Sequence, residues 1–138
     1  MKKKSWIIEQ SKVFCDDRGK LLVVESPSET QEAFQRMYCL HFNERGQTRG
    51  HHAHKNLIQK MIVLKGQVRV CVDNGVLKDE FILDENDNLV LKILPVTWRV
   101  LESLRKNCIL AVLARDTYDE TDYIRRYEDF QKYVSYKC

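Results

Sequence analysis

The stretch Gly46-Gln47-Thr48-Arg49-Gly50-His51-His52-Ala53-His54-Lys55 contains three of the four histidines in this chain. It lies between two short apolar segments, 37–42 and 57–64, that have the composition of β-strands. His52 and His54 are two residues apart, so their imidazoles leave the same face of an extended strand. Because histidine titrates near neutral pH, the segment is the first candidate for acid–base chemistry. The alternative is a surface turn that carries its histidines by chance.

Short apolar segments follow one another on both sides of this stretch. Asp16-Asp17-Arg18-Gly19 and Asp73-Asn74-Gly75 are typical hairpin turns between such segments. Closely spaced short strands with turns of this kind indicate a β-sandwich or β-barrel. We therefore predict an all-β protein in which Thr30 to Arg36 is a polar connector. The predicted strands are 6–14, 20–25, 37–42, 57–64, 67–72, 78–83, 89–94, 98–101 and 108–113.

The end of the chain has a different pattern. From Asp119 onward, apolar residues recur at helical spacing instead of alternating. Asp119 and Thr121 are both residue types that cap helices. We predict one amphipathic C-terminal helix that packs on the barrel. Its apolar positions are Tyr123, Ile124, Tyr127, Phe130 and Val134.

Length and composition describe one globular domain, residues 1–138. Its 138 residues are 43% hydrophobic and 31% charged, as in ordinary proteins with a buried core. The net charge of +3 is too small to indicate a nucleic-acid partner. No apolar stretch reaches the length of a membrane span, and Lys2-Lys3-Lys4 is not followed by the apolar region of a signal peptide.

The cysteines are odd in number and scattered, and no Cys-x-x-Cys pair occurs. This pattern indicates free thiols in a reducing cytoplasm and argues against zinc. The five residues are Cys15, Cys39, Cys71, Cys108 and Cys138.

The histidine stretch fits the first motif of the cupins, which are small double-stranded β-helix or jelly-roll barrels. The chain has Gly46, five residues, His52-Ala53-His54, four residues, Gln59, six residues and Gly66. Gln59 stands where cupins have a metal-binding glutamate, and Pro95 to Val100 holds no histidine where the second motif supplies one. A divalent metal needs three or four firm ligands, commonly with a carboxylate. We therefore predict no metal and no cofactor, and imidazoles that carry protons.

Together these motifs make the sequence resemble one family, the nucleotide-sugar 3,4-ketoisomerases, over nearly its whole length. Members act on dTDP-4-keto-6-deoxyglucose in pathways to deoxyamino sugars. Trp98-Arg99 stands where the family usually has Trp-His, and Cys39 replaces a second tyrosine. These departures leave the exact substrate isomer open more than the reaction class. The sequence does not determine the stereochemistry at C4 of the product either. The resemblance rests on Asp17-Arg18-Gly19, Glu25, Arg36-Met37-Tyr38, Arg49 to Lys55, Gln59, Gly66, Asp73-Asn74-Gly75, Trp98 and Tyr118 to Tyr127.

The resemblance implies a metal-independent tautomerisation in a cupin barrel. A base removes the C3 proton of the 4-keto sugar, and a proton reaches C4 through an enediol-like intermediate while O3 becomes the carbonyl. We assign His52 and His54 as the acid–base pair, without choosing which one acts on carbon. Tyr38 is assigned to relay or stabilise a proton on the sugar oxygens, and its alternative role is an aromatic side chain that fills the barrel.

Four further residues are predicted to bind the substrate. Arg18 and Arg49 suit a diphosphate, because guanidinium binds phosphate with two parallel hydrogen bonds. Trp98 is assigned to stack on thymine or ribose. Gln59 is the fourth residue predicted to bind the substrate. For Arg18 the alternative is an ordinary surface charge, and for Trp98 it is a place in the core.

Other readings of the sequence remain open. A 3,5-epimerase of the same sugars is the second choice, because that metal-free cupin family relies on a His–Asp pair and a tyrosine, and no Asp partner is evident from the sequence. A non-catalytic sugar-binding cupin is third, and a metal-dependent dioxygenase is disfavoured by Gln59. The resemblance also implies a homodimer, with exchanged N-terminal strands as one arrangement, and the cysteine pattern indicates that it is cytoplasmic. Its products would serve lipopolysaccharide or S-layer glycans.

Overall fold

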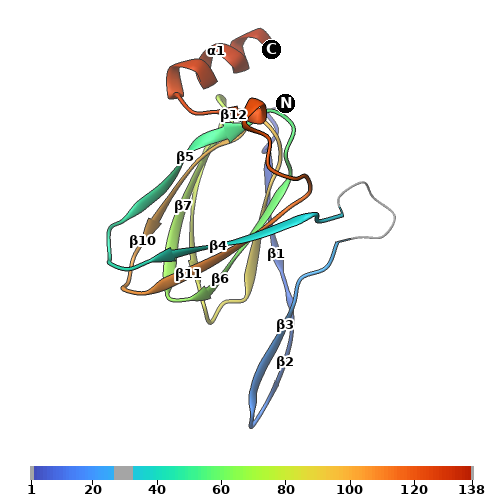
Figure 1. Ribbon diagram of the computed structural model, residues 1–138, viewed down its shortest axis with the longest axis vertical. Coiled ribbons are helices and arrows are strands. Elements are labelled where there is room, and N and C mark those ends of the chain that lie inside the picture. The colour runs from blue at the N-terminus through green and yellow to red at the C-terminus, as the bar shows by residue number, and fades with distance from the viewer. Residues whose placement is uncertain (1, 27–32, 138) are drawn as a thin grey trace.

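The main body of the protein is a barrel of two facing antiparallel β-sheets, with a helix at one end and a projecting hairpin at the other (Figure 1). The computed structural model describes residues 2–26 and 33–137. The predicted all-β class with a C-terminal helix is confirmed.

Each main sheet has five strands. In one sheet the order is β1 (Trp6–Gln10), β9 (Leu89–Ile93), β6 (Gln59–Lys65), β11 (Cys108–Ala114) and β4 (Arg36–Phe42). In the other it is β12 (Tyr123–Ile124), β5 (Thr48–His54), β10 (Trp98–Ser103), β7 (Gln67–Asp73) and β8 (Lys78–Asp84). The hairpin consists of β2 (Lys12–Asp16) and β3 (Gly19–Val23).

The core lies between the two sheets and follows from the alternation of apolar residues. On β7, Val68, Val70 and Val72 are buried while the residues between them are half-buried, as a strand with one inward face requires. Full burial of such a side chain stabilises the fold by about 1.5–3 kcal/mol. Other buried members of the core are Trp6, Phe42, Met61, Val63, Leu83, Leu91, Ile93, Leu101, Cys108, Leu110 and Val112.

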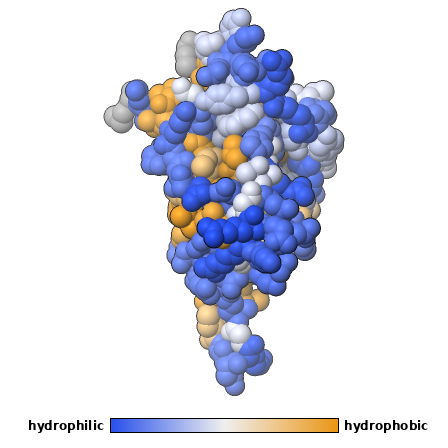
Figure 2. Space-filling view, turned by 90° about the vertical axis from the view of Figure 1, so that its left-hand side faces the viewer, coloured by the Kyte–Doolittle hydropathy of each residue, from blue (hydrophilic) through white to orange (hydrophobic). Residues whose placement is uncertain are grey.

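The predicted strand 6–14 is two strands. The chain leaves the barrel at Ser11, whose backbone N–H and hydroxyl both donate to the carbonyl of Asn88, at 3.1 and 2.6 Å. Beyond this point β2 pairs with β3, and the hairpin extends away from the body. Phe14 and Leu21 are 61% and 62% exposed on it, and apolar surface is visible on the projecting hairpin in Figure 2.

The predicted connector at Thr30 to Arg36 falls partly on residues 30–32, which lie outside the described residues. Arg36 belongs to β4.

The predicted start of the C-terminal helix is wrong. The helix α1 (Tyr127–Lys137) begins after Tyr123 and Ile124, which form β12 and pair with His54 and Ala53 of β5. Asp119 does act as a cap, but it caps the short 3₁₀ turn η1 (Glu120–Asp122). The apolar spacing suited both arrangements, and a free edge of β5 was available for pairing. The chain thereby brings Asp122 and Tyr123 to the histidines.

The cysteine prediction agrees with the structure where it applies: Cys15, Cys39, Cys71 and Cys108 are free thiols, and Cys138 lies outside the described residues. Within 2–26 and 33–137, no helix is long and apolar enough to cross a membrane.

Candidate active site

The histidine stretch forms β5, and a bulge in this strand sets the direction of each imidazole. The pairing with β10 shifts register so that Arg99 lies opposite His52 and Val100 lies opposite Gly50. Gly50 has a φ of +89°, and a Cβ there would lie 2.9 Å from the Arg99 carbonyl oxygen. Only glycine therefore suits this position. His51 is the extra residue of the bulge and is exposed, with a hydrogen bond of 3.1 Å to Thr48.

His52 and His54 lie together on the inner face of β5. Their ring centroids are 4.9 Å apart and their planes are nearly perpendicular. Tyr123 packs against both rings, with centroid distances of 5.1 Å to His52 and 4.3 Å to His54. The spacing of two residues therefore brings the two imidazoles into one site.

Hydrogen bonds fix the tautomer of both imidazoles. The Nδ1 of His54 lies 3.0 Å from a carboxylate oxygen of Asp122, and the Nδ1 of His52 lies 3.0 Å from the carbonyl oxygen of Gly50. Both partners accept, so each Nδ1 carries the hydrogen and each Nε2 keeps a lone pair. Both Nε2 atoms are buried without a hydrogen-bond partner among the described residues. Each imidazole therefore presents an unprotonated lone pair on Nε2.

Burial keeps both imidazoles neutral. It lowers the pKa of His52 to about 4 and that of His54 to about 2, and in both cases the positive charge of Arg99 is the next largest cause. Asp122 accepts a hydrogen bond from the Nδ1 of His54 and would stabilise an imidazolium once it forms. The lowered pKa values mean that both groups are unprotonated at neutral pH.

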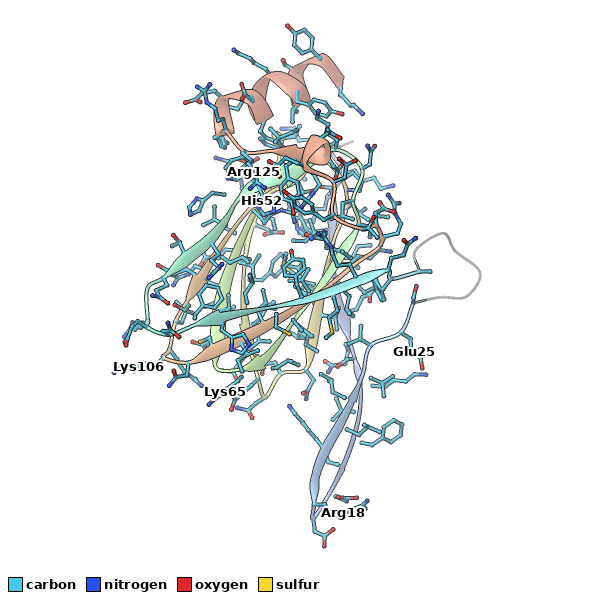
Figure 3. All side chains as sticks on the ribbon, in the orientation of Figure 1. Arg18, Glu25, His52, Lys65, Lys106 and Arg125 are labelled. Atoms are coloured by element: carbon cyan, nitrogen blue, oxygen red, sulfur yellow. The ribbon has the colours of Figure 1, made fainter. Side chains whose placement is uncertain are left out.

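A cavity of about 400 Å³ opens in front of His52. Its wall is rich in arginine, and Figure 3 shows Arg125 beside His52 at the end of the barrel that carries α1. A wall of this charge suits an anionic ligand such as a diphosphate. The lining residues are Arg36, Met37, Tyr38, Leu40, Arg49, Gly50, His52, Met61, Arg99, Leu101, Tyr123 and Arg125.

His54 lines a second, smaller cavity of about 210 Å³, where Asp116, Asp119 and Asp122 supply carboxylates. Among residues 2–26 and 33–137, no group of three or more His, Cys, Asp or Glu side chains is arranged to hold a metal ion.

Comparisons with known proteins bear on this geometry. The family model described as "FdtA: WxcM-like, C-terminal" matches residues 3–135. This chain belongs to the FdtA family. It is 36% identical over 124 residues to the TDP-4-oxo-6-deoxy-alpha-D-glucose-3,4-oxoisomerase of Aneurinibacillus thermoaerophilus, covering 90% of this chain and 88% of that protein. The family predicted from the sequence is confirmed.

Several solved structures also match this chain. A mutant of the 3,4-ketoisomerase QdtA from Thermoanaerobacterium thermosaccharolyticum, in complex with TDP-4-keto-6-deoxyglucose, matches with a TM-score of 0.89 and 28% identity, covering 99% of this chain and 98% of that chain. A 3,4-ketoisomerase from Helicobacter canadensis matches with a TM-score of 0.88 and 30% identity, covering 96% and 99%. A dTDP-4-dehydrorhamnose 3,5-epimerase from Bacillus anthracis shares the fold, with a TM-score of 0.77 and 16% identity over 86% and 76%.

In this FdtA-family chain, some predicted site residues meet and others do not. His52, Tyr38 and Arg49 line the cavity of about 400 Å³, and His54 lies against His52. Gln59 is fully buried behind Tyr38, to which its amide nitrogen donates at 3.0 Å. These residues form one connected site.

Trp98 and Arg18 lie elsewhere in the single chain. Trp98 packs against Tyr127 and Phe130 of the α1 region, with ring centroids 5.3 and 5.8 Å away, and does not line the cavity. Arg18 sits at the tip of the projecting hairpin, far from His52 (Figure 3), and pairs with Asp16. The structure thus places Trp98 in an aromatic cluster under α1, and a substrate role for Arg18 requires a second copy of the chain.

Sequence reasoning missed Asp122, Tyr123 and Arg99. No Asp partner of a histidine is evident from the sequence, but the structure supplies one, Asp122. Asp122 is 68 residues from His54, so only the pairing of β12 with β5 reveals it. In the sequence Arg99 is only a departure from the family's Trp-His, whereas in the structure it is a buried arginine whose charge acts on both imidazoles.

Proposed function

We propose that this protein is a nucleotide-sugar 3,4-ketoisomerase that converts dTDP-4-keto-6-deoxyglucose to a dTDP-3-keto-6-deoxyhexose. The observation that carries the proposal is an arginine-lined cavity with His52 on its wall and His54 against His52, where the buried Nε2 atoms of both imidazoles have no hydrogen-bond partner among the described residues. Membership of the FdtA family and the names of its relatives support it. The sequence-based prediction of an isomerase agrees with those names.

We assign His54 as the carbon base because it has a carboxylate partner, while His52, whose ring lies against it, lines the cavity. The C4 ketone acidifies the C3 hydrogen, and the imidazolium that forms when His54 takes this proton is stabilised by Asp122. The product of this step is an enediolate with negative charge on O4. The proton on His54 exchanges with solvent, and delivery of a solvent-derived proton to C4 in place of C3 completes the shift of hydrogen between the two carbons.

His52 and Tyr38 are placed to handle the oxygens. In the net reaction a proton moves from O3 to O4, so one group must accept it from O3 while O4 is stabilised. His52 lies on the cavity wall with its Nε2 lone pair free, and Tyr38 lies on the same wall with its hydroxyl. We assign His52 to move the proton between the oxygens and Tyr38 to stabilise the charge on O4.

The diphosphate is proposed to bind the arginines on the cavity wall. Arg49 was predicted for this role, and Arg36 and Arg125 join it in the cavity lining. Arg125 is held across the Tyr123 ring at 4.2 Å and pairs with Glu120. Such a fixed guanidinium loses little freedom when a phosphate binds.

A cytoplasmic homodimer and a role in deoxyamino sugars of lipopolysaccharide or S-layer glycans also remain proposals. The projecting hairpin supports the dimer, because Phe14 and Leu21 on it are largely exposed to solvent in the single chain. An exchange of N-terminal strands would bury them and carry Arg18 to a second copy. Light scattering on wild type and on the Phe14→Ser/Leu21→Ser variant tests this: wild type should be dimeric, and the variant should shift towards monomer.

One observation favours a second candidate, the 3,5-epimerase: the His54–Asp122 pair has the form on which that family relies. The low identity of 16% to a solved epimerase supports a common fold and nothing more. Epimerase remains second.

NMR of the product formed in deuterated water separates these candidates. The purified protein is incubated with dTDP-4-keto-6-deoxyglucose, and the positions of the ketone and of deuterium are determined. A ketoisomerase gives a 3-keto sugar with deuterium at C4 and hydrogen retained at C5. Deuterium at C5 with the ketone still at C4 would identify an epimerase. Unchanged sugar would instead support a binding protein.

A further inference from the structure

A chain of hydrogen bonds runs from a buried arginine to the tyrosine on the cavity wall. Arg99 is 1% exposed, and its NH1 donates to the Oε1 of Gln59. The Nε2 of Gln59 donates to the hydroxyl oxygen of Tyr38 at 3.0 Å. The other donors of Arg99 bond the carbonyl of Thr97, at 3.2 and 3.1 Å. Arg99, Gln59 and Tyr38 belong to β10, β6 and β4. The series of hydrogen bonds therefore depends on the tertiary fold.

The direction of every bond in this chain is fixed by Arg99. A guanidinium has donors and no acceptor, so it must meet the oxygen of the Gln59 amide and not its nitrogen. The nitrogen is then turned to Tyr38, where it can only donate. The Tyr38 oxygen therefore accepts, and its own hydrogen is left for another partner. If the group in place of Arg99 could both donate and accept, either end of the Gln59 amide could face Tyr38, and no single orientation would be preferred.

Burial of the Arg99 guanidinium is unfavourable for the free energy of folding. Among residues 2–26 and 33–137 no carboxylate forms an ion pair with it, although burying an unpaired guanidinium costs several kcal/mol. Burial lowers its pKa only to about 10, so it stays charged at neutral pH. Burial also raises the pKa of Tyr38, which therefore keeps its proton. The buried charge of Arg99 is unfavourable for folding, yet it orients the neutral hydroxyl of Tyr38 at the cavity. This indicates that Arg99 has a role beyond stability.

We propose that Arg99 and Gln59 are positioning residues that aim the Tyr38 hydroxyl into the cavity as a hydrogen-bond donor to the charged oxygen of the enediolate. The inference rests on the proposed ketoisomerase reaction. It gives the glutamine at the cupin metal-ligand position a function that a glutamate cannot perform. Tyr38 would contact the substrate, whereas Gln59 and Arg99 act through it.

The sharpest test is Gln59→Glu, which changes one NH2 into an oxygen. The carboxylate keeps a partner in Arg99, so the fold should be retained. It accepts from Tyr38, however, and draws the hydroxyl hydrogen away from the cavity. We expect kcat to fall by about 10²–10³, the usual effect of losing one donor to a developing oxyanion. KM should change much less, because the charge on the oxygen develops only during the reaction.

Double variants show whether the residues act through Tyr38. Tyr38→Phe should lower kcat as much as Gln59→Glu does, and the combined variant should be no worse than Tyr38→Phe alone. Arg99→Met, which frees the amide to reverse, should also lower kcat in wild type and have no further effect after Tyr38→Phe. Tyr127→Phe is the matched control, because Tyr127 is a half-buried tyrosine that donates to Asp73 outside the cavity; its kcat should stay at the wild-type level.

All assays contain a chelator, because a glutamate at position 59 restores a typical cupin ligand. Wild type that forms no 3-keto sugar would overturn the proposed function and this inference with it. Active wild type combined with a Gln59→Glu variant that is folded by circular dichroism and keeps more than a third of kcat would overturn the inference alone. The inference would also be overturned if the factors by which the single substitutions lower kcat multiply in the double variants.

Discussion

His54 and Asp122 are joined by a hydrogen bond of 3.0 Å between Nδ1 and Oδ2, although they are 68 residues apart in the chain. Asp122 is held in place at two further points. Its Oδ1 accepts from the backbone N–H of Asn56 at 2.7 Å, and its carbonyl accepts from the N–H of Lys55 at 2.9 Å. The carboxylate therefore has one oxygen committed to the backbone and the other to the imidazole.

Asp122→Asn should inactivate the enzyme while leaving the fold intact. The N–H of Asn56 requires an acceptor, so the oxygen of the new amide stays there and its NH2 turns to His54. The Nδ1 of His54 must then accept, which moves its hydrogen to Nε2 and removes the base. We expect kcat to fall by about 10²–10⁴, with a change of only a few degrees in the melting temperature. A variant that keeps a tenth of wild-type kcat would contradict this role of Asp122.

Activity should not depend on added metal. Gln59, which stands at the cupin carboxylate position, uses both ends of its amide within the protein, towards Arg99 and Tyr38. Two imidazoles alone would hold a divalent ion weakly. Turnover after exhaustive chelation should equal that of untreated protein, and elemental analysis should find less than stoichiometric iron, zinc and manganese. Activity that is lost on chelation and restored by one of these metals would refute the metal-free mechanism.

The sequence was enough to predict the barrel and the histidine pair, because both depend on local patterns. Strand alternation and turn residues determine the first, and a spacing of two residues determines the second. The partners of the histidines were not predictable in the same way. Asp122 and Tyr123 reach them only because the chain forms β12 before it forms the helix.

The same limit applies to the substrate-binding residues. Trp98 looked like a stacking surface, yet alternation along β10 turns it outward to Tyr127 while its neighbour Arg99 faces inward. The bulge at Gly50 changes the register of β10 against β5 and so decides which residue lies opposite His52. Register is a property of two paired strands, and a single strand's sequence does not contain it.

Stability and activity should both fall in mild acid. The pKa of His52 is lowered to about 4 in the folded state from an ordinary value of 6.5. The unfolded chain therefore binds more protons between these values, so the contribution of neutral His52 to stability is complete above about pH 6.5 and is lost as the pH falls towards 4. The pH profile of kcat/KM should be flat near neutrality and fall with a midpoint near 4.

The comparison variant for this measurement is His52→Asn. Urea unfolding between pH 4 and 7 should show a smaller loss of stability for the variant than for wild type, because one buried titrating group is gone. Equal slopes for the two proteins would mean that His52 is not the group responsible.

The two imidazoles should be separable by hydrogen exchange at C3. If His54 removes the C3 proton, His54→Asn should lower two rates by about 10²–10⁴ each. These are the rate of product formation and the rate at which the C3 hydrogen exchanges with deuterated water. If His52 moves the proton between O3 and O4, His52→Asn should still form the enediolate. That intermediate then returns to the 4-keto sugar, so NMR should show deuterium at C3 of unreacted substrate while the 3-keto sugar accumulates slowly.

His51→Asn is the matched control for this pair, because His51 is exposed on the bulge and lies outside the lining of either cavity beside the imidazoles. It should exchange and isomerise at wild-type rates. The reverse pattern, with exchange retained in His54→Asn and lost in His52→Asn, would exchange the two roles and leave Asp122 without its proposed function. Loss of exchange in both variants would mean that the two imidazoles act on carbon together, since neither Nε2 would then be dispensable for breaking the C3–H bond.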